Sequence, residues 1–195
     1  ASVLRTTHAT QTVATMKTST GLSGIKLLSS VTRTSGYHAD MQGNGAVIDK
    51  CEFGNYYIGV NVGVVGGTQI VGGAITNCKF RDPAVSAGAG AIQFMNFSNG
   101  VVGDCIITGP SLPSTQPDFG LRFSNGDTVF VYGTNITIHG KALLIDPQAG
   151  SNCYALTIDG SVFDSSGTIT GGVTVSSAEI IPAGGVWNTR ISNTW

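Results

Sequence analysis

Three aspartates could carry out acid–base chemistry on a sugar chain. Only 11 of the 195 residues are acidic, so few carboxyl groups compete for a catalytic role. Glycoside hydrolysis needs two carboxyl groups on either side of the scissile bond, roughly 5 to 9.5 Å apart. Asp82 with Asp118 is the first candidate pair, and Asp118 with Asp146 is the second. A lyase would instead need an arginine or lysine as base, for which Arg122 is the candidate.

Neutral polar and aromatic side chains near these aspartates suit the binding of a sugar. Sugar hydroxyls need many neutral hydrogen bonds, and sugar faces stack on aromatic rings. We expect six residues to contact such a ligand: Tyr56, Tyr57, Asn61, Gln93, Arg122 and Ser124. In the repeat described below, Gln93 and Arg122 align with Gly59 in one outward row. Asn61 and Ser124 align one position further out, with Asp146.

Other chemistries find little support in the sequence. The three histidines form no triad spacing, and GxSxG, DxDxDG and Walker-type glycine motifs are absent. CxxC and CxxH pairs are also absent, so we expect no metal and no cofactor. The net charge is −1 without a basic cluster, which argues against nucleic-acid binding. Since no apolar run approaches the ~20 residues of a membrane span, we expect no membrane insertion.

A repeat of about 27 residues must position these candidates. Cysteines recur in IDKCEF, ITNCKF and VGDCII, and each follows an aliphatic residue by three positions. The same template continues in both directions and gives the equivalent positions Ile25, Cys51, Cys78, Cys105, Thr134, Ser161 and Thr189. We call these positions the ladder. The repeat predicts an all-β protein, a right-handed parallel β-helix of about seven coils.

Each coil is expected to stack on the previous one at the strand spacing of about 4.8 Å. The ladder residue, the residue three before it and the residue two after it should point inward. The residue just before the ladder position turns a corner. Gly, Asn or Asp there suits a left-handed backbone, and only Lys50 departs. Cys51, Cys78 and Cys105 should form an internal stack of buried thiols, with Cys153 off the ladder.

The composition predicts a surface of hydroxyls, amides and backbone groups. Charged residues make up 11% of the chain, against roughly 25% in an ordinary soluble domain. Residues 1–20 are polar and rich in Thr, and we expect them to cap the solenoid formed by residues 21–195.

Two connections are longer than the others, at 81–90 and 108–119 in adjacent coils. They should project side by side, and loops on a rigid solenoid commonly carry binding sites. The alternative is that they are decorative or make subunit contacts. Glu52 and Lys79 occupy equivalent positions one coil apart, so we expect them to form a surface ion pair.

The ladder motif in IDKCEF, ITNCKF and IDGSVF resembles the right-handed parallel β-helix superfamily typified by pectate lyases and bacteriophage tailspikes. The resemblance covers residues 22–191. The low-charge composition most resembles a tailspike or tail-fibre segment. That resemblance implies a homotrimer, on a virion or outside the cell, that binds and often depolymerises host surface polysaccharide. Pectate lyases typically carry calcium-binding Asp clusters, and no such cluster occurs in this sequence.

Three functions remain open at this point. The first is a virion-associated, tailspike-like β-helix that binds host cell-surface polysaccharide as a receptor. The second is a polysaccharide depolymerase, a hydrolase or lyase, that uses Asp82, Asp118 or Asp146. The third is a structural shaft or assembly domain of a fibre. The pattern is specific for the fold and unspecific for function, because one fold supports many functions.

Overall fold

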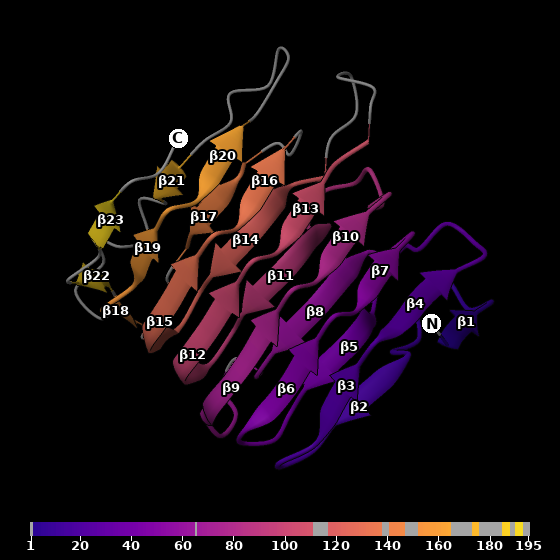
Figure 1. The fold of residues 1–195 in the computed structure, drawn as a ribbon, viewed down its shortest axis with the longest axis horizontal. Coiled ribbons are helices and arrows are strands. Elements are labelled where there is room, and N and C mark those ends of the chain that lie inside the picture. The colour runs from indigo at the N-terminus through magenta and orange to yellow at the C-terminus, as the bar shows by residue number, and fades with distance from the viewer. Residues whose placement is uncertain are drawn as a thin grey trace.

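The chain folds into three parallel β-sheets that wind together as a solenoid (Figure 1). A computed structural model describes residues 2–64, 66–110, 117–137, 141–146, 152–164, 173–175, 185–187 and 190–192. Sheet A contains, in spatial order, β1 (Ser2–Thr6), β4 (Ile25–Ser29), β7 (Glu52–Gly54), β10 (Lys79–Arg81), β13 (Ile106–Thr108), β16 (Asn135–Thr137) and β20 (Val162–Asp164). Sheet B contains β2 (Ala14–Met16), β5 (Tyr37–Met41), β8 (Ile58–Val62), β11 (Gly90–Phe94), β14 (Phe119–Phe123), β17 (Leu143–Ile145) and β21 (Val173–Val175).

Sheet C completes each turn. It contains β3 (Gly21–Ser23), β6 (Ala46–Asp49), β9 (Ile70–Thr76), β12 (Phe97–Gly103), β15 (Gly126–Tyr132), β18 (Asn152–Tyr154) and β22 (Gly185–Trp187). Two further strands lie beside this path, because β19 (Thr157–Asp159) pairs with β15 and with β23 (Arg190–Ser192). From β1 to β18, consecutive strands along the chain therefore belong to different sheets, and each strand pairs with its equivalent one turn away; β18 and β19 both pair with β15.

The predicted fold class is confirmed, but the number of turns was wrong. The structure is a parallel β-solenoid with turns of ~27 residues and about 5 turns rather than 7. Three-sheet turns follow one another from β4 to β19. A ladder position in the sequence does not by itself show a complete turn, because a turn needs one strand in each of the three sheets. The last ladder position, Thr189, lies outside the described residues.

The corner geometry predicted from the repeat is confirmed. The residue before the ladder position has a φ between 52° and 65° at six successive corners: Gly24, Lys50, Asn77, Asp104, Gly133 and Gly160. A left-handed backbone costs roughly 1–2 kcal/mol in most L-residues, which explains the selection of Gly, Asn and Asp. Lys50 adopts the same conformation, with φ 53°, although its residue type does not favour it.

Ladder side chains fill the interior as expected. Cys51, Cys78 and Cys105 are buried free thiols, and Cys153 is also free and buried. The residues two places after the ladder stack above one another. The Phe53 and Phe80 rings lie 4.6 Å apart between centroids and are nearly parallel. The stack thus places residues about 27 positions apart in direct contact.

The N-terminal residues contribute the outermost strands of sheets A and B. β1 pairs with β4 from Ser2↔Ile25 to Thr6↔Ser29, and β2 pairs with β5. They therefore cover the end of the following turn. Whether residues 1–20 act as a separate cap stays a prediction.

Candidate functional site

The outer face of sheet B carries a row of polar side chains. Asp40 pairs in register with Asn61, Asn61 with Gln93, and Gln93 with Arg122. We call these four residues the outer row. Side chains alternate across a strand, so the outer row faces away from the core residues on either side of it.

The register corrects our alignment of Asn61. We aligned Ile58 with Ile92, which placed Asn61 one position beyond Gln93. In the structure Ile58 pairs with Gly90, and Val60 pairs with Ile92. The shift arises because the connections between sheets A and B differ in length, so counting from the ladder does not fix the register of sheet B.

A continuous hydrogen-bond network links three members of the outer row, Asp40, Asn61 and Gln93. Asn61 Nδ2 donates to Asp40 Oδ1 at 2.7 Å and to the Gly63 carbonyl at 2.9 Å. Gln93 Nε2 donates to Asn61 Oδ1 at 2.8 Å. Asp40 also accepts a hydrogen bond from Gln42 Nε2 at 2.7 Å. Because Asn61 is 1% exposed and its amide groups are already bonded, it stabilises the sheet and offers little to a ligand.

Both candidate carboxylates on sheet B are paired with cations. Arg122 donates to Asp146 Oδ2 at 2.8 Å, and its guanidinium lies 5.9 Å from the centre of the Phe119 ring. Lys141 Nζ lies 2.9 Å from Asp118 Oδ1. The Asp118 carboxylate also accepts a hydrogen bond from the Gly88 backbone at 3.3 Å.

Strand geometry separates Asp118 from Asp146. Asp118 precedes β14, and Asp146 follows β17, the neighbouring strand. Phe123 pairs with Ile145, which puts the two aspartates on the order of 20 Å apart at ~3.3 Å per residue. A glycosidase pair needs roughly 5–9.5 Å, and this pair lies well outside that window.

Asp82 lies at the corner between sheets A and B. It has a left-handed backbone with φ 54° and an ion pair to Arg81 at 2.6 Å. It lines a pocket of about 390 Å³ together with Arg33 and Asn55. Asp118 contacts Gly88 in the same long connection, so Asp82 with Asp118 remains the predicted pair.

The predicted sugar-binding residues have very different environments. Tyr56 is 0% exposed and packs edge-on against Phe80; burial raises the pKa of its hydroxyl. Ser124 is also fully buried, so neither side chain is accessible to a ligand. Tyr57 is partly exposed and donates to the Ala87 carbonyl at 2.9 Å. Of the aromatic candidates, Tyr57 alone is open to solvent.

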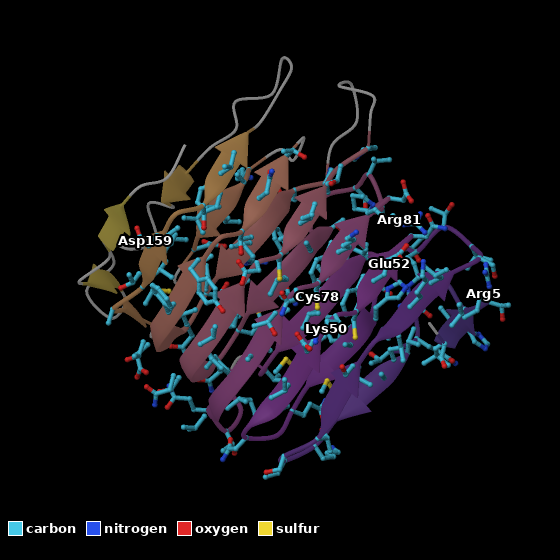
Figure 2. All side chains as sticks on the ribbon, in the orientation of Figure 1. Arg5, Lys50, Glu52, Cys78, Arg81 and Asp159 are labelled. Atoms are coloured by element: carbon cyan, nitrogen blue, oxygen red, sulfur yellow. The ribbon has the colours of Figure 1, made fainter. Side chains whose placement is uncertain are left out.

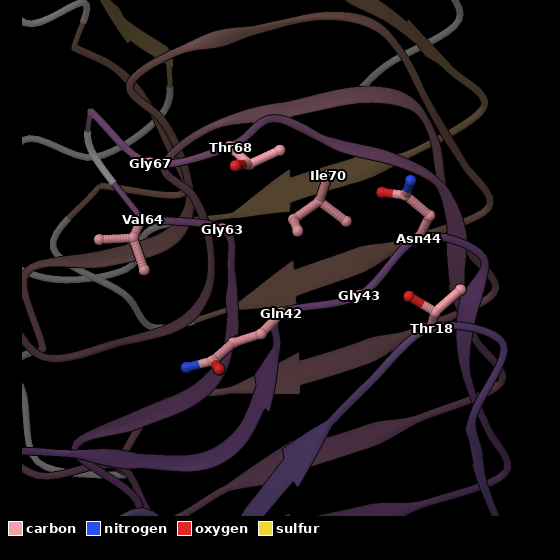
Figure 3. Close-up of a pocket in the computed structure, with 9 residues that line it drawn as sticks. All are labelled: Thr18, Gln42, Gly43, Asn44, Gly63, Val64, Gly67, Thr68 and Ile70. Carbon is pink, nitrogen blue, oxygen red and sulfur yellow. The ribbon is translucent and has the colours of Figure 1, made fainter.

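A pocket that the sequence analysis missed adjoins the outer row (Figure 3). It has a volume of about 380 Å³. Its lining is Thr18, Gln42, Gly43, Asn44, Gly63, Val64, Gly67, Thr68 and Ile70. We call it the neutral pocket, because no lining residue is charged. Gln42 and Gly63 connect it to the outer row through Asp40 and Asn61.

The neutral pocket is built from corner segments of three successive turns. Thr18, Gln42, Asn44 and Thr68 are exposed in it. A Cβ at Gly43 would overlap the backbone of Thr18, so the close approach of neighbouring corners requires glycine. The signal in the sequence was the pair of segments QGNG (42–45) and GGTQ (66–69), which are typical of turns.

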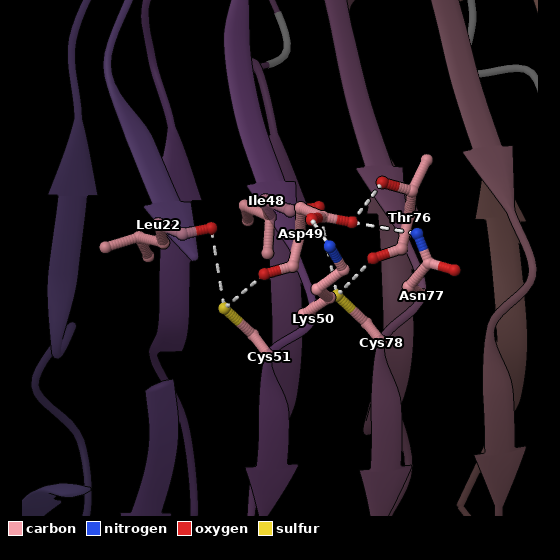
Figure 4. Close-up of polar contacts among 8 residues, drawn as sticks. All are labelled: Leu22, Ile48, Asp49, Lys50, Cys51, Thr76, Asn77 and Cys78. Carbon is pink, nitrogen blue, oxygen red and sulfur yellow. Dashed lines mark hydrogen bonds and ion pairs between the residues drawn. The ribbon is translucent and has the colours of Figure 1, made fainter. Parts of the chain in front are cut away.

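Two charged clusters lie near the corner between sheets C and A. Asp49 accepts hydrogen bonds from Asn77 and Thr76, both at 2.9 Å, and these lower its pKa (Figure 4). Glu52 pairs with Lys26 and Arg81, both at 2.6 Å, and these cations lower its pKa (Figure 2).

We expected Glu52 to pair with Lys79, but in the structure it pairs with Lys26 and Arg81. Side chains of adjacent turns point to the same side of the sheet, and the Arg81 side chain is long enough to reach back to Glu52. Among the described residues no group of three or more His, Cys, Asp or Glu could hold a metal ion.

The geometry defines a parallel β-solenoid of about 5 turns. Comparison with protein-family models, with curated proteins and with solved structures found no match. In the part of the chain that the structure describes, no helix has the length and apolar character needed to cross a membrane.

Proposed function

We propose that this solenoid binds host cell-surface polysaccharide, as the receptor-binding part of a virion or another extracellular fibre. The observation that supports the proposal best is the neutral pocket. Its exposed hydroxyl groups can donate and accept hydrogen bonds, and the carboxamides of Gln42 and Asn44 keep further positions beside their bonds to Asp40, Lys17 and the Val71 backbone. These groups match the many hydroxyl groups of a sugar. A pocket without charged residues suits a neutral glycan better than an anionic one.

The position of the pocket also favours an extended ligand. Thr18, Gln42 and Thr68 come from three successive turns, and neighbouring turns are about 4.8 Å apart. The pocket is therefore elongated along the solenoid axis, which suits a polysaccharide lying along this axis. The rigid backbone holds these groups in place before binding, which reduces the entropy cost of association.

A glycan array with the purified chain tests this proposal. Thr68→Trp fills the pocket with an indole ring, and Ile106→Trp is the matched control on the exposed face of sheet A. We expect the wild-type chain and Ile106→Trp to bind the same glycans, and Thr68→Trp to bind at least tenfold more weakly. Equal binding by both variants would contradict a site in the pocket. Absence of binding to any glycan would favour a structural shaft.

Cleavage of the polysaccharide is the second candidate function. It is supported by Asp82 and Asp118, which are both associated with the long connection before β11. Asp118→Asn keeps the shape of the side chain and removes its charge. If the chain is a depolymerase, it releases reducing ends from a bound glycan, and Asp118→Asn abolishes that release without affecting binding. A wild-type chain that binds and releases nothing would leave binding as the function.

A further inference from the structure

The outer face of sheet C carries two adjacent rows of different character. The first row is apolar and consists of Val47, Ala74, Val101 and Phe130, which pair in register. The second row consists of Asp49, Thr76, Gly103 and Tyr132, also in register. The residues between the rows face the core and are buried. Val47 and Phe130 are each 40% exposed, so the apolar row is open to solvent.

Two aromatic rings meet at one end of these rows. The Phe130 and Tyr132 ring centroids are 5.4 Å apart, with an angle of 30° between the ring planes. A Cβ at Gly103 would overlap the Tyr132 ring, which shows that the ring lies across the neighbouring strand β12. The glycine therefore allows Tyr132 to lie against the sheet beside Phe130. We call Phe130 and Tyr132 the aromatic platform.

Polar groups lie further along the second row, beyond Gly103. Thr76 lies next to Gly103 in the second row, and its hydroxyl donates to Asp49 Oδ1 at 2.9 Å. A carboxylate has about four acceptor positions, so Asp49 can accept further hydrogen bonds. The face thus combines flat apolar rings with the Thr76 hydroxyl two strands away and the Asp49 carboxylate three strands away. On the other side, Thr157 and Asp159 pair in register with Phe130 and Tyr132.

We propose that the aromatic platform is a second carbohydrate-binding site, which takes the flat, C–H-bearing face of a pyranose ring in a polysaccharide. The apolar C–H face packs on the rings, and hydroxyls of neighbouring sugar units in the same chain reach Thr76 and Asp49, about 10 and 14 Å further along the row at about 4.8 Å per strand. The location of this site follows from sheet C alone, whereas the ligand class rests on the proposed function. The neutral pocket lies at the corner between sheets B and C and is lined by residues between Thr18 and Ile70, whereas the platform lies on β15, so the two sites are distinct.

The dimensions of the apolar row favour a sugar over a protein partner. The row is one side chain wide, and its four strands span on the order of 15 Å at about 4.8 Å per step. A stable protein interface needs about 800 Å² from each partner, which such a narrow strip does not supply. Two near-parallel rings of this size instead match the face of a single sugar ring.

Affinity electrophoresis in gels that contain dextran, xylan or hydroxyethyl cellulose, together with any glycan found on the array, tests this site. Phe130→Leu keeps the apolar character and removes the ring, Tyr132→Ala removes the second ring, and Tyr132→Phe preserves it. We expect Phe130→Leu and Tyr132→Ala to weaken retardation at least fivefold. Tyr132→Phe should remain within twofold of the wild-type chain.

The possible results separate this inference from the proposed function. Loss of binding in the platform variants, with folding unchanged by circular dichroism, supports the second site. Normal binding by both ring-removing variants together with loss in Thr68→Trp overturns the platform and leaves the pocket. Absence of wild-type binding to any of these polysaccharides overturns both. A lower mass in light scattering for Phe130→Leu, with binding unchanged, would show instead that the platform is a contact between copies.

Discussion

Lys50 is the residue whose type agrees least with its backbone. Its φ of 53° matches the corner residues of the other turns, and its side chain is largely exposed. The Asp49 carboxylate lies 3.6 Å from its ammonium group, a surface pair that contributes little. The conformation therefore lacks an evident compensation for its steric cost.

We predict that Lys50→Gly raises the free energy of unfolding by roughly 0.5–1 kcal/mol, because glycine removes the left-handed strain but loses more chain entropy on folding. Urea denaturation measures the difference. Lys79→Gly is the control, since Lys79 lies in strand β10, where glycine weakens the strand. A less stable Lys50→Gly variant would show that the lysine side chain contributes more than its backbone strain costs.

His38 makes stability depend on pH. It is 0% exposed, and neither ring nitrogen has a hydrogen-bond partner among the described residues. Burial, and then the charge of Arg33, lower its pKa to about 3. In the unfolded chain histidine takes up a proton near pH 6.5. The folded state therefore binds fewer protons between these values, and stability falls as the pH decreases through this window.

We predict that the free energy of unfolding falls by up to about 1.4 kcal/mol per pH unit below pH ~6.5, and that His38→Phe removes most of this dependence between pH 7 and pH 5. Phenylalanine suits the site because Phe53 and Tyr56 surround the ring. Asp49 and Glu52 have lowered pKa values, so they also reduce the free energy of unfolding as the pH falls. They do so only at a pH low enough to protonate carboxylates in the unfolded chain. Equal slopes for the variant and the wild-type chain over this interval would contradict the assignment.

A single residue with a positive φ explains why the burial of Tyr56 could not be predicted from the sequence. The sequence places Tyr56 and Tyr57 together in NYY, and alternation alone does not say which one faces the core. Asn55 has a φ of 56°, which breaks the strand alternation just before them. Tyr56 then points inward and Tyr57 outward. The burial of Tyr56 depends on this turn and could not be read from periodicity.

The elements of the solenoid were predictable to different degrees. The inward positions and the corner between sheets C and A follow from the 27-residue period, because each places a recognisable residue type at a fixed offset. The register of sheet B was not predictable, since it follows connections of unequal length. A second row of left-handed residues in sheet C, formed by Gly45, Gly72, Asn99, Thr128 and Ala155, has too varied a composition to stand out in the sequence.

We predict that Gly103→Ala displaces the Tyr132 ring from strand β12 and weakens polysaccharide retardation, although it removes no group of the aromatic platform. The reason is that an added Cβ would overlap the ring. A shift in tyrosine fluorescence reports the displacement. Gly21→Ala in β3 is the control, because its Cβ would meet the Val47 carbonyl oxygen at 3.5 Å, an ordinary contact. Unchanged fluorescence and binding in Gly103→Ala would contradict the flat orientation of the ring.

At the scale of the whole molecule, the repeat predicts the solenoid but not its function. The sites arise where corners of successive turns meet or where two outward rows lie side by side, and neither arrangement is visible before the register is known. The number of turns was overestimated because ladder positions were counted without the strands that close each turn. The carbohydrate class of the proposed ligand follows from the residue types at the sites, whereas the host-surface setting is what the resemblance to tailspikes implies.

Subunit organisation is the prediction that belongs to the whole molecule. We predict a homotrimer, in line with the resemblance to tailspikes. Light scattering at micromolar concentration should give three times the chain mass of 20.0 kDa. A mass of one chain at that concentration would contradict the trimer and would leave the binding sites to act in single copies.

The central claim is that stacked turns bring residues about 27 positions apart into direct contact, since every site described above depends on that register. A crystal structure of the chain tests it most directly. It should show the Cα atoms of Cys51, Cys78 and Cys105 in one column, with steps of about 4.8 Å, and the Phe53 and Phe80 rings stacked beside them. A structure in which these three cysteines lie in different parts of the molecule would contradict the solenoid and, with it, both proposed binding sites.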